Sequence, residues 1–89
     1  MKILMVDDDA GLRSACTRTL EREGHDVSAV ESAEKAFEAV AKESFDLLVT
    51  DVGLPGISGD ALAVSVRRSH PQTDVIIVTG AWAWPWSTA

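Results

Sequence analysis

The chain has 89 residues, of which 46% are hydrophobic and 25% charged, and its formal net charge is -6. These values are ordinary for one globular domain and argue against disorder. The negative charge repels phosphate backbones and no apolar run reaches the length of a membrane span, so we expect neither nucleic acid nor a membrane as a direct partner. The lone cysteine, Cys16, cannot build a disulfide framework, which favours a reducing compartment and predicts a cytoplasmic protein.

Short apolar segments alternate with segments of helical periodicity along the whole chain. Strands are predicted at residues 2–6, 26–30, 46–50 and 74–79, and helices at residues 11–23, 33–43 and 59–69. Gly24 is expected to end the first helix, and Ser32 and Ser58 are expected to cap the second and third. This alternation predicts an α/β fold in which a parallel sheet carries helices on both faces.

Acidic residues follow two of the predicted strands. Asp7 and Asp8 come directly after the first strand, and Asp51 ends the third, whereas Asp9 is better placed to cap the first helix. In an open parallel sheet, ligands bind beyond the carboxyl ends of the strands, so these carboxylates are expected to converge if the first and third strands are neighbours. Clustered carboxylates ionise together at little cost only around a cation, and hard oxygen ligands suit Mg²⁺. The fourth strand ends at the same rim with Thr79, a hydroxyl that can donate to a phosphoryl oxygen.

Three segments together resemble the receiver domain of bacterial two-component response regulators. They read MVDDDAGLR, DLLVTDVGLPGISG and VIIVTG, and their spacing also matches over residues 1–80. The resemblance implies a flavodoxin-like (CheY-like) fold with a four-stranded parallel sheet in the order 2-1-3-4 and three helices. It implies that Asp51 accepts a phosphoryl group from a sensor histidine kinase and that Thr79 is the switch hydroxyl. It further implies an Mg²⁺ site formed by Asp7, Asp8, Asp51 and the backbone carbonyl of Gly53.

The sequence departs from the family after Gly80. The family continues with a helix, a strand that ends in a lysine, and a further helix, and nine residues cannot hold them, so we interpret the chain as a receiver truncated after its fourth strand. The family lysine contacts the phosphoryl group. Lys2 starts the first strand at the wrong end of the sheet, Lys35 and Lys42 belong to the second helix, and Arg13 is a weak stand-in. This departure puts phosphorylation, conventional output and the kinase partner in question.

The last nine residues, 81–89, are interpreted as a tryptophan-rich tail separate from the domain at residues 1–80. The tail carries the segment AWAWPW, and the preceding strand, if left at an edge, exposes the β-branched run VIIVT. Such an edge invites pairing with another chain. We therefore expect a homodimer formed through residues 74–86.

Three functions remain open at this point. The first is a truncated phosphoacceptor module that keeps its Mg²⁺ pocket and is not itself an enzyme. The second is an inert pseudo-receiver that acts as a structural or interaction module. The third is a small phosphatase-like enzyme with Asp51 as nucleophile, which ranks last because nothing in the sequence supplies its general acid.

Overall fold

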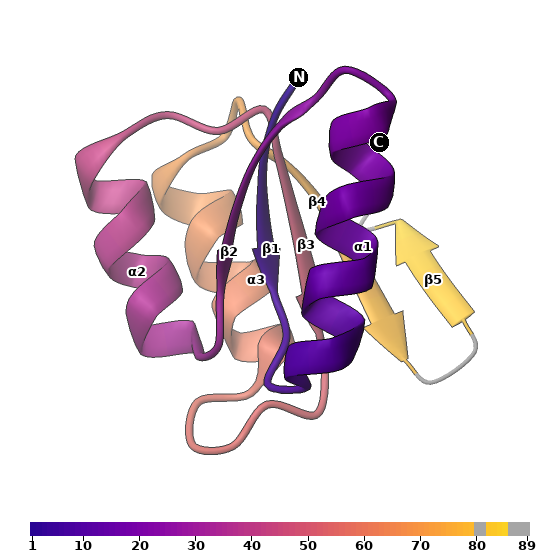
Figure 1. Ribbon diagram of the computed structural model, residues 1–89. Helices are drawn as coiled ribbons and strands as arrows, with labels where there is room; N and C mark the ends of the chain where they lie inside the picture. Colours follow the sequence, from indigo (N-terminus) through magenta and orange to yellow (C-terminus); the bar gives the residue numbers. More distant parts are fainter. Residues whose placement is uncertain (80–81, 86–89) are drawn as a thin grey trace.

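The elements follow the predicted order, with one addition at the end. The structure is a computed structural model that describes residues 1–79 and 82–85, the main chain alone at residues 79 and 82–85. Figure 1 shows the elements β1 (Lys2–Val6), α1 (Ala10–Arg22), β2 (Asp26–Val30), α2 (Ala33–Lys42), β3 (Leu47–Asp51), α3 (Gly59–Ser69), β4 (Asp74–Thr79) and β5 (Trp82–Pro85).

The sheet has the strand order β2-β1-β3-β4-β5. The first four strands pair in parallel, so the predicted four-stranded parallel sheet in the order 2-1-3-4, with three helices, is confirmed. Parallel neighbours place all four carboxyl ends at one rim of the sheet. That rim lies at the bottom of Figure 1, where the loops after β1 and β3 meet.

The expectation that β4 is an open edge is wrong. Residues 82–85 fold back and pair antiparallel with β4, so that Trp84 lies opposite Ile77 and Trp82 opposite Thr79. A parallel return would need a crossover connection of about a dozen residues, whereas an antiparallel hairpin needs a connection of only two. Residues 80 and 81 alone separate β4 from β5, so no helix lies between these strands. The predicted packing of the tryptophan side chains lies outside the described residues.

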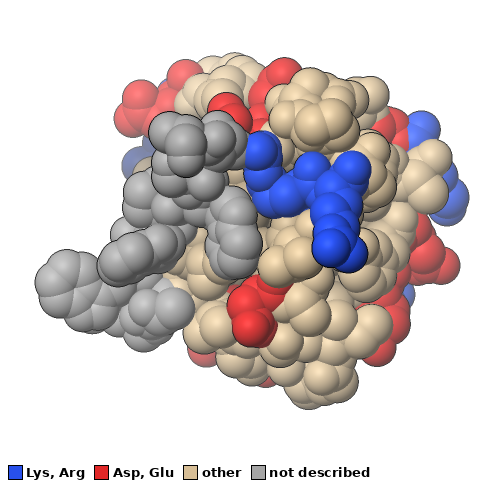
Figure 2. Space-filling model, turned by 180° about the vertical axis from the view of Figure 1, so that it is seen from behind, with Lys and Arg blue, Asp and Glu red and all other residues tan. Residues whose placement is uncertain are grey.

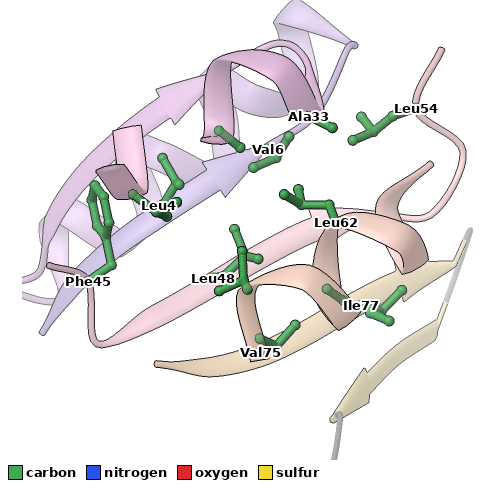
Figure 3. Packing of buried hydrophobic residues seen from close by; sticks show 13 residues of the cluster. Leu4, Val6, Ala33, Phe45, Leu48, Leu54, Leu62, Val75 and Ile77 are labelled. Atoms are coloured by element: carbon green, nitrogen blue, oxygen red, sulfur yellow. The ribbon is translucent and has the colours of Figure 1, made fainter. Parts of the chain in front are cut away.

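The main hydrophobic core lies between the sheet and the helices α2 and α3. Alternate residues of three strands point to this face and lie at matched levels, with Leu4 beside Leu48 and Leu48 beside Val75. Figure 3 shows these side chains meeting Leu62 of α3 and the other buried residues of the same cluster. The core thereby fixes α2 and α3 against the strands whose ends carry the acidic residues.

Among the described helices, α1 is the one that covers the opposite face of the sheet. Beside this helix an apolar groove of about 410 Å³ runs over β1, β3 and β4. Its walls come from α1 residues that include Cys16 and from alternate strand residues, among them Met5, Val49, Ile76 and Val78. On this side Met5 of β1 is buried, but the β3 and β4 residues Val49, Ile76 and Val78 are only half-buried, in contrast to the full core on the other side.

Two of the predicted helix caps form as expected. Asp9 accepts a hydrogen bond from the Leu12 amide at the start of α1, and the Ser32 hydroxyl accepts one from the Lys35 amide at the start of α2. Ser58 occupies the N-cap position of α3, but its side chain makes no capping hydrogen bond. The first helix also begins one residue earlier than predicted, because the Asp9 cap admits Ala10 to its first turn.

Charged side chains are spread over the face of the molecule opposite to the view of Figure 1. Figure 2 shows the molecule from behind, with a small group of basic side chains near the middle and acidic side chains scattered around it. The last turn of α3 carries two basic residues, Arg67 and Arg68. Within the described part of the chain, no helix is long and apolar enough to cross a membrane.

Candidate functional site

Three carboxylates meet at the rim formed by the carboxyl ends of β1 and β3. One oxygen from each of Asp7, Asp8 and Asp51 lies within 4.8 Å of the others. Their environments differ, since Asp7 is buried, Asp51 half-buried and Asp8 exposed. The neighbouring placement of β1 and β3 in the sheet causes this convergence, because each strand delivers its following acid to the same rim.

Main-chain amides hold two of these carboxylates by one oxygen each. The Asp9 amide donates to Oδ1 of Asp7 at 2.8 Å, and the Gly53 amide donates to Oδ1 of Asp51 at 3.2 Å. Among the described residues, the Oδ2 atoms of Asp7 and Asp51 have no hydrogen-bond partner. Each carboxylate is thus oriented by the backbone and keeps a second oxygen available to a ligand.

The negative charge of the cluster is not offset by an ion pair. Within residues 1–79, the salt bridges join Lys2 to Glu43 and Lys35 to Glu31, and neither includes one of the three carboxylates. Three close negative charges without a paired cation repel one another. This donor set, all carboxylate oxygen and without an ion pair among the described residues, fits a hard divalent cation such as Mg²⁺.

Burial raises the pKa of Asp7 above its ordinary value. The amide of Asp9 opposes this shift by stabilising the charged form, whereas the negative charges of Asp51, Asp8 and Asp9 add to it. The folded protein therefore holds the Asp7 proton more tightly than the unfolded chain does. The stabilisation that comes from this tighter proton binding is complete below the pKa that Asp7 has in the unfolded chain. It is lost as the pH rises through the pKa of Asp7 in the folded protein.

We expect Asp7→Asn to stabilise the metal-free protein, and to do so increasingly as pH rises from about 4 towards 7. Asparagine keeps an oxygen to accept the Asp9 amide but has no proton to lose. Urea unfolding at several pH values in the presence of a chelator measures the difference. Asp26→Asn, which removes an exposed acid at the opposite end of the sheet, is the matched control. A gain from Asp7→Asn that does not change with pH would contradict the assignment.

The remaining predicted site residues lie near the cluster to different degrees. The amide of Gly53 contacts Asp51, and a Cβ at this glycine would lie 3.9 Å from Oδ1 of Asp51, which is ordinary contact. Thr79 is the last residue of β4 and follows Val78, which pairs with Asp51. The main chain of Thr79 therefore reaches the same rim as the cluster. The side chain of Thr79 lies outside the described part of the structure. Lys2 lies at the other end of β1, as predicted, and forms an ion pair with Glu43 there.

Two contacts at the site were not predicted from the sequence. The Arg13 guanidinium donates through Nη1 to the main-chain oxygen of Asp7 at 2.7 Å. Gly59, the first residue of α3, presses against the main chain of Asp51, so that a Cβ there would lie 1.9 Å from its carbonyl oxygen. A signal for Arg13 was present, because it lies one helical turn after the Asp9 cap and so faces the loop before the helix. Nothing in the local pattern distinguished Gly59 from an ordinary helix start.

Comparison with known proteins gives consistent similarities. The family model described as "Response regulator receiver domain" matches residues 3–84. The chain is 41% identical over 78 residues to the response regulator protein FleR of Pseudomonas aeruginosa, covering 88% of this chain and 16% of FleR. It is 39% identical over 84 residues to the two-component response regulator PhoP of the same organism, covering 94% of this chain and 37% of PhoP. The chain thus spans well under half the length of either relative.

A solved structure agrees with these matches. The response regulator TrrA of Thermotoga maritima, crystallised in complex with Mg²⁺ and BeF, superimposes with a TM-score of 0.84 at 31% identity. The match covers 88% of this chain and 68% of the TrrA chain. A second structure holds the histidine kinase ThkA in complex with TrrA and gives a TM-score of 0.84 at 30% identity, covering 91% of this chain and 70% of that chain.

Proposed function

The chain belongs to the response regulator receiver domain family, as its sequence motifs implied, and from this we propose that it is a phosphoacceptor module in which Asp51 receives the phosphoryl group. The observation that carries the proposal is the cluster of Asp7, Asp8 and Asp51, whose oxygens lie within 4.8 Å of one another. Receiver domains are signalling modules, and we propose no catalytic turnover for this one. The lone cysteine supports a cytoplasmic location.

The proposed donor is a phosphohistidine of a sensor histidine kinase. This partner is supported by the relative TrrA, which is solved in complex with the kinase ThkA. In the transfer, an oxygen of Asp51 forms a bond to phosphorus while the bond between phosphorus and the donor nitrogen breaks. The electron pair and a proton remain with the donor imidazole. The product is an acyl phosphate on Asp51.

The chain's own residues contribute alignment and charge to this step. The Gly53 amide fixes Oδ1 of Asp51 and leaves the other oxygen for attack. Asp7, Asp8, Asp51 and the carbonyl of Gly53 would hold Mg²⁺, which supplies positive charge against the phosphoryl oxygens. We propose Thr79 as the hydroxyl that donates to the phosphoryl group, since its main chain reaches the same rim as Asp51.

A lysine contact to the phosphoryl group has no counterpart among the three lysines of the chain. Lys2 lies at the opposite rim, and Lys35 and Lys42 belong to α2. The Arg13 guanidinium contacts the main chain of Asp7, which directly follows β1. In the sheet, β1 lies between β2 and β3. Loss of one charge-assisted hydrogen bond removes about 1.5–3 kcal/mol from the stability of the phosphorylated form. For residues 1–89 taken by themselves, we therefore propose that Asp51 is phosphorylated but holds the group less firmly than a receiver with a lysine.

We expect Mg²⁺ or Mn²⁺ to bind at the cluster and Asp51→Asn to weaken that binding. The loss should be at least about tenfold, because even outer-shell partners of a metal ligand are typically worth that much. Isothermal titration of both proteins measures the effect. Asp26→Asn, which removes the same charge far from the cluster, should bind as the wild type does. Equal binding by wild type and Asp51→Asn would remove Asp51 from the site.

A second candidate function is an interaction module without phosphorylation. The apolar groove beside α1 favours it, because a large apolar surface on one side of a sheet is a common place for a partner. A homodimer also remains a prediction, but β5 already occupies the β4 edge, so two β4 strands cannot pair across a dimer axis. Among the described residues, the outer edge of β5 and the groove are the surfaces nearest the predicted interface that stay open to self-association.

Incubation with acetyl phosphate and Mg²⁺ separates these functions. Stable label on the protein supports the phosphoacceptor. No label, together with a sedimenting dimer, supports the interaction module. Sustained release of phosphate without accumulated label supports the phosphatase-like alternative and contradicts the main proposal.

A further inference from the structure

The first turn of α1 and the loop before it form one hydrogen-bonded unit around the acidic residues. Asp9 caps the helix by accepting from the Leu12 amide at 3.0 Å, and its carbonyl accepts from the Arg13 amide at 2.9 Å. The Asp9 amide in turn donates to Oδ1 of Asp7. The Arg13 side chain closes the unit by donating to the main-chain oxygen of Asp7 at 2.7 Å.

The choice of acceptor is the informative feature of this contact. Arg13 is a cation next to three carboxylates, yet the hydrogen bond that its side chain makes among the described residues goes to a carbonyl. A guanidinium bonded to a carboxylate would compete with a metal for its oxygens. Because the Arg13 guanidinium is bonded to the main-chain oxygen of Asp7, it fixes the backbone between Asp7 and Asp8. The Oδ2 atom of Asp7 then stays free to bind a ligand.

From these contacts we propose that Arg13 is a positioning residue that holds the Asp7–Asp8 segment in the geometry a divalent cation requires. This inference deepens the proposed function and rests on the cluster being a metal site. Arg13 touches neither the cation nor the phosphoryl group in this role. It acts through the main chain of Asp7, as outer-shell partners of metal ligands do.

Charge and positioning make opposite predictions for the removal of Arg13. As a nearby positive charge, Arg13 repels a divalent cation, so its removal should tighten metal binding. As a positioning residue, it keeps the ligands in place, so its removal should weaken binding. The sign of the change in metal affinity therefore distinguishes the two roles.

The test compares Arg13→Met with Arg18→Met by titration with Mn²⁺ alone. Arg18 is exposed on the same helix, and it makes no hydrogen bond or ion pair among the described residues, so its variant loses the same charge without the contact. We expect Arg13→Met to bind Mn²⁺ about tenfold more weakly than the wild type. Arg18→Met should bind as the wild type does or slightly more tightly. Arg13→Lys, which keeps a charged donor, should recover part of the loss.

A second measurement keeps the inference independent of metal binding. In the metal-free protein, hydrogen exchange of the Asp9 amide reports on its bond to Asp7. Exchange at this amide should be faster in Arg13→Met than in Arg18→Met, while amides in the β3 core stay protected in both. Tighter Mn²⁺ binding by Arg13→Met, or equal Asp9 exchange in the two variants, overturns the positioning role. A wild type that binds no Mn²⁺ sinks the proposed metal site instead, and the exchange comparison still decides whether Arg13 positions the loop.

Discussion

Replacing Asp51 by asparagine should reduce labelling by radioactive acetyl phosphate to the background of a protein-free sample. An amide lacks the anionic oxygen that attacks phosphorus, and the variant also removes one of the three carboxylates that meet at the rim. Asparagine keeps the shape of the side chain and an oxygen to accept the Gly53 amide. The fold should therefore survive, and the effect should be confined to the chemistry.

Two controls make this result interpretable. Asp26→Asn changes the net charge equally at the far end of the sheet and should label like the wild type. Addition of a chelator should reduce labelling of the wild type as well, because the attacking carboxylate and the phosphoryl oxygens repel each other without a cation. Label that persists on Asp51→Asn would place the acceptor elsewhere, with the exposed Asp8 as the next carboxylate to replace.

The sequence was sufficient to predict the sheet and the meeting of the acids. Short apolar strands alternating with single helices specify a parallel sheet, and a parallel sheet brings its carboxyl ends to one rim. The positions of Asp7 and Asp51 relative to those strands then follow, and the structure places their oxygens together with one of Asp8. The strand order came from the resemblance to the receiver family, since periodicity does not determine which strands are neighbours.

What the sequence did not reveal depends on contacts between distant segments. The tail was predicted to be part of a dimer interface beside an open β4 edge, whereas Trp82–Pro85 pairs antiparallel with β4. The alternation of apolar residues before Pro85 is compatible with a strand that pairs within the chain and with a segment that packs on a second subunit. The pairing of residues 82–85 with β4 decides between them. In the same way, Gly59 reads as an ordinary helix start until α3 is placed against the end of β3.

The contact of Gly59 has the largest expected effect on stability. A Cβ at this position would lie 1.9 Å from the carbonyl oxygen of Asp51 and 2.7 Å from its carbonyl carbon. Real Cβ atoms essentially never approach closer than 3.0 Å, and these neighbours are backbone atoms that cannot rotate away. Either the start of α3 or the end of β3 must therefore move, although Leu62 of α3 is fully buried in the core.

We expect Gly59→Ala to lower the free energy of unfolding by about 3 kcal/mol, the upper end of the usual cost of overpacking. A small domain has little stability to spare, so urea unfolding should show the loss clearly. Gly11→Ala is the matched control, because its Cβ would meet only the Asp9 side chain, at 3.4 Å, inside α1. That substitution should raise stability by about 0.5 kcal/mol, since alanine loses less conformational freedom in a helix than glycine does.

The same substitution links the packing of α3 to the chemistry of the rim. If the end of β3 moves to admit the new methyl group, Asp51 moves with it, and Mn²⁺ binding by the folded fraction should weaken as well. If α3 moves instead, stability falls while metal affinity stays near that of the wild type. Stability equal to that of the wild type would contradict the close contact between Gly59 and Asp51. A joint loss of stability and affinity would establish that the backbone at residue 59 sets the position of the phosphoacceptor.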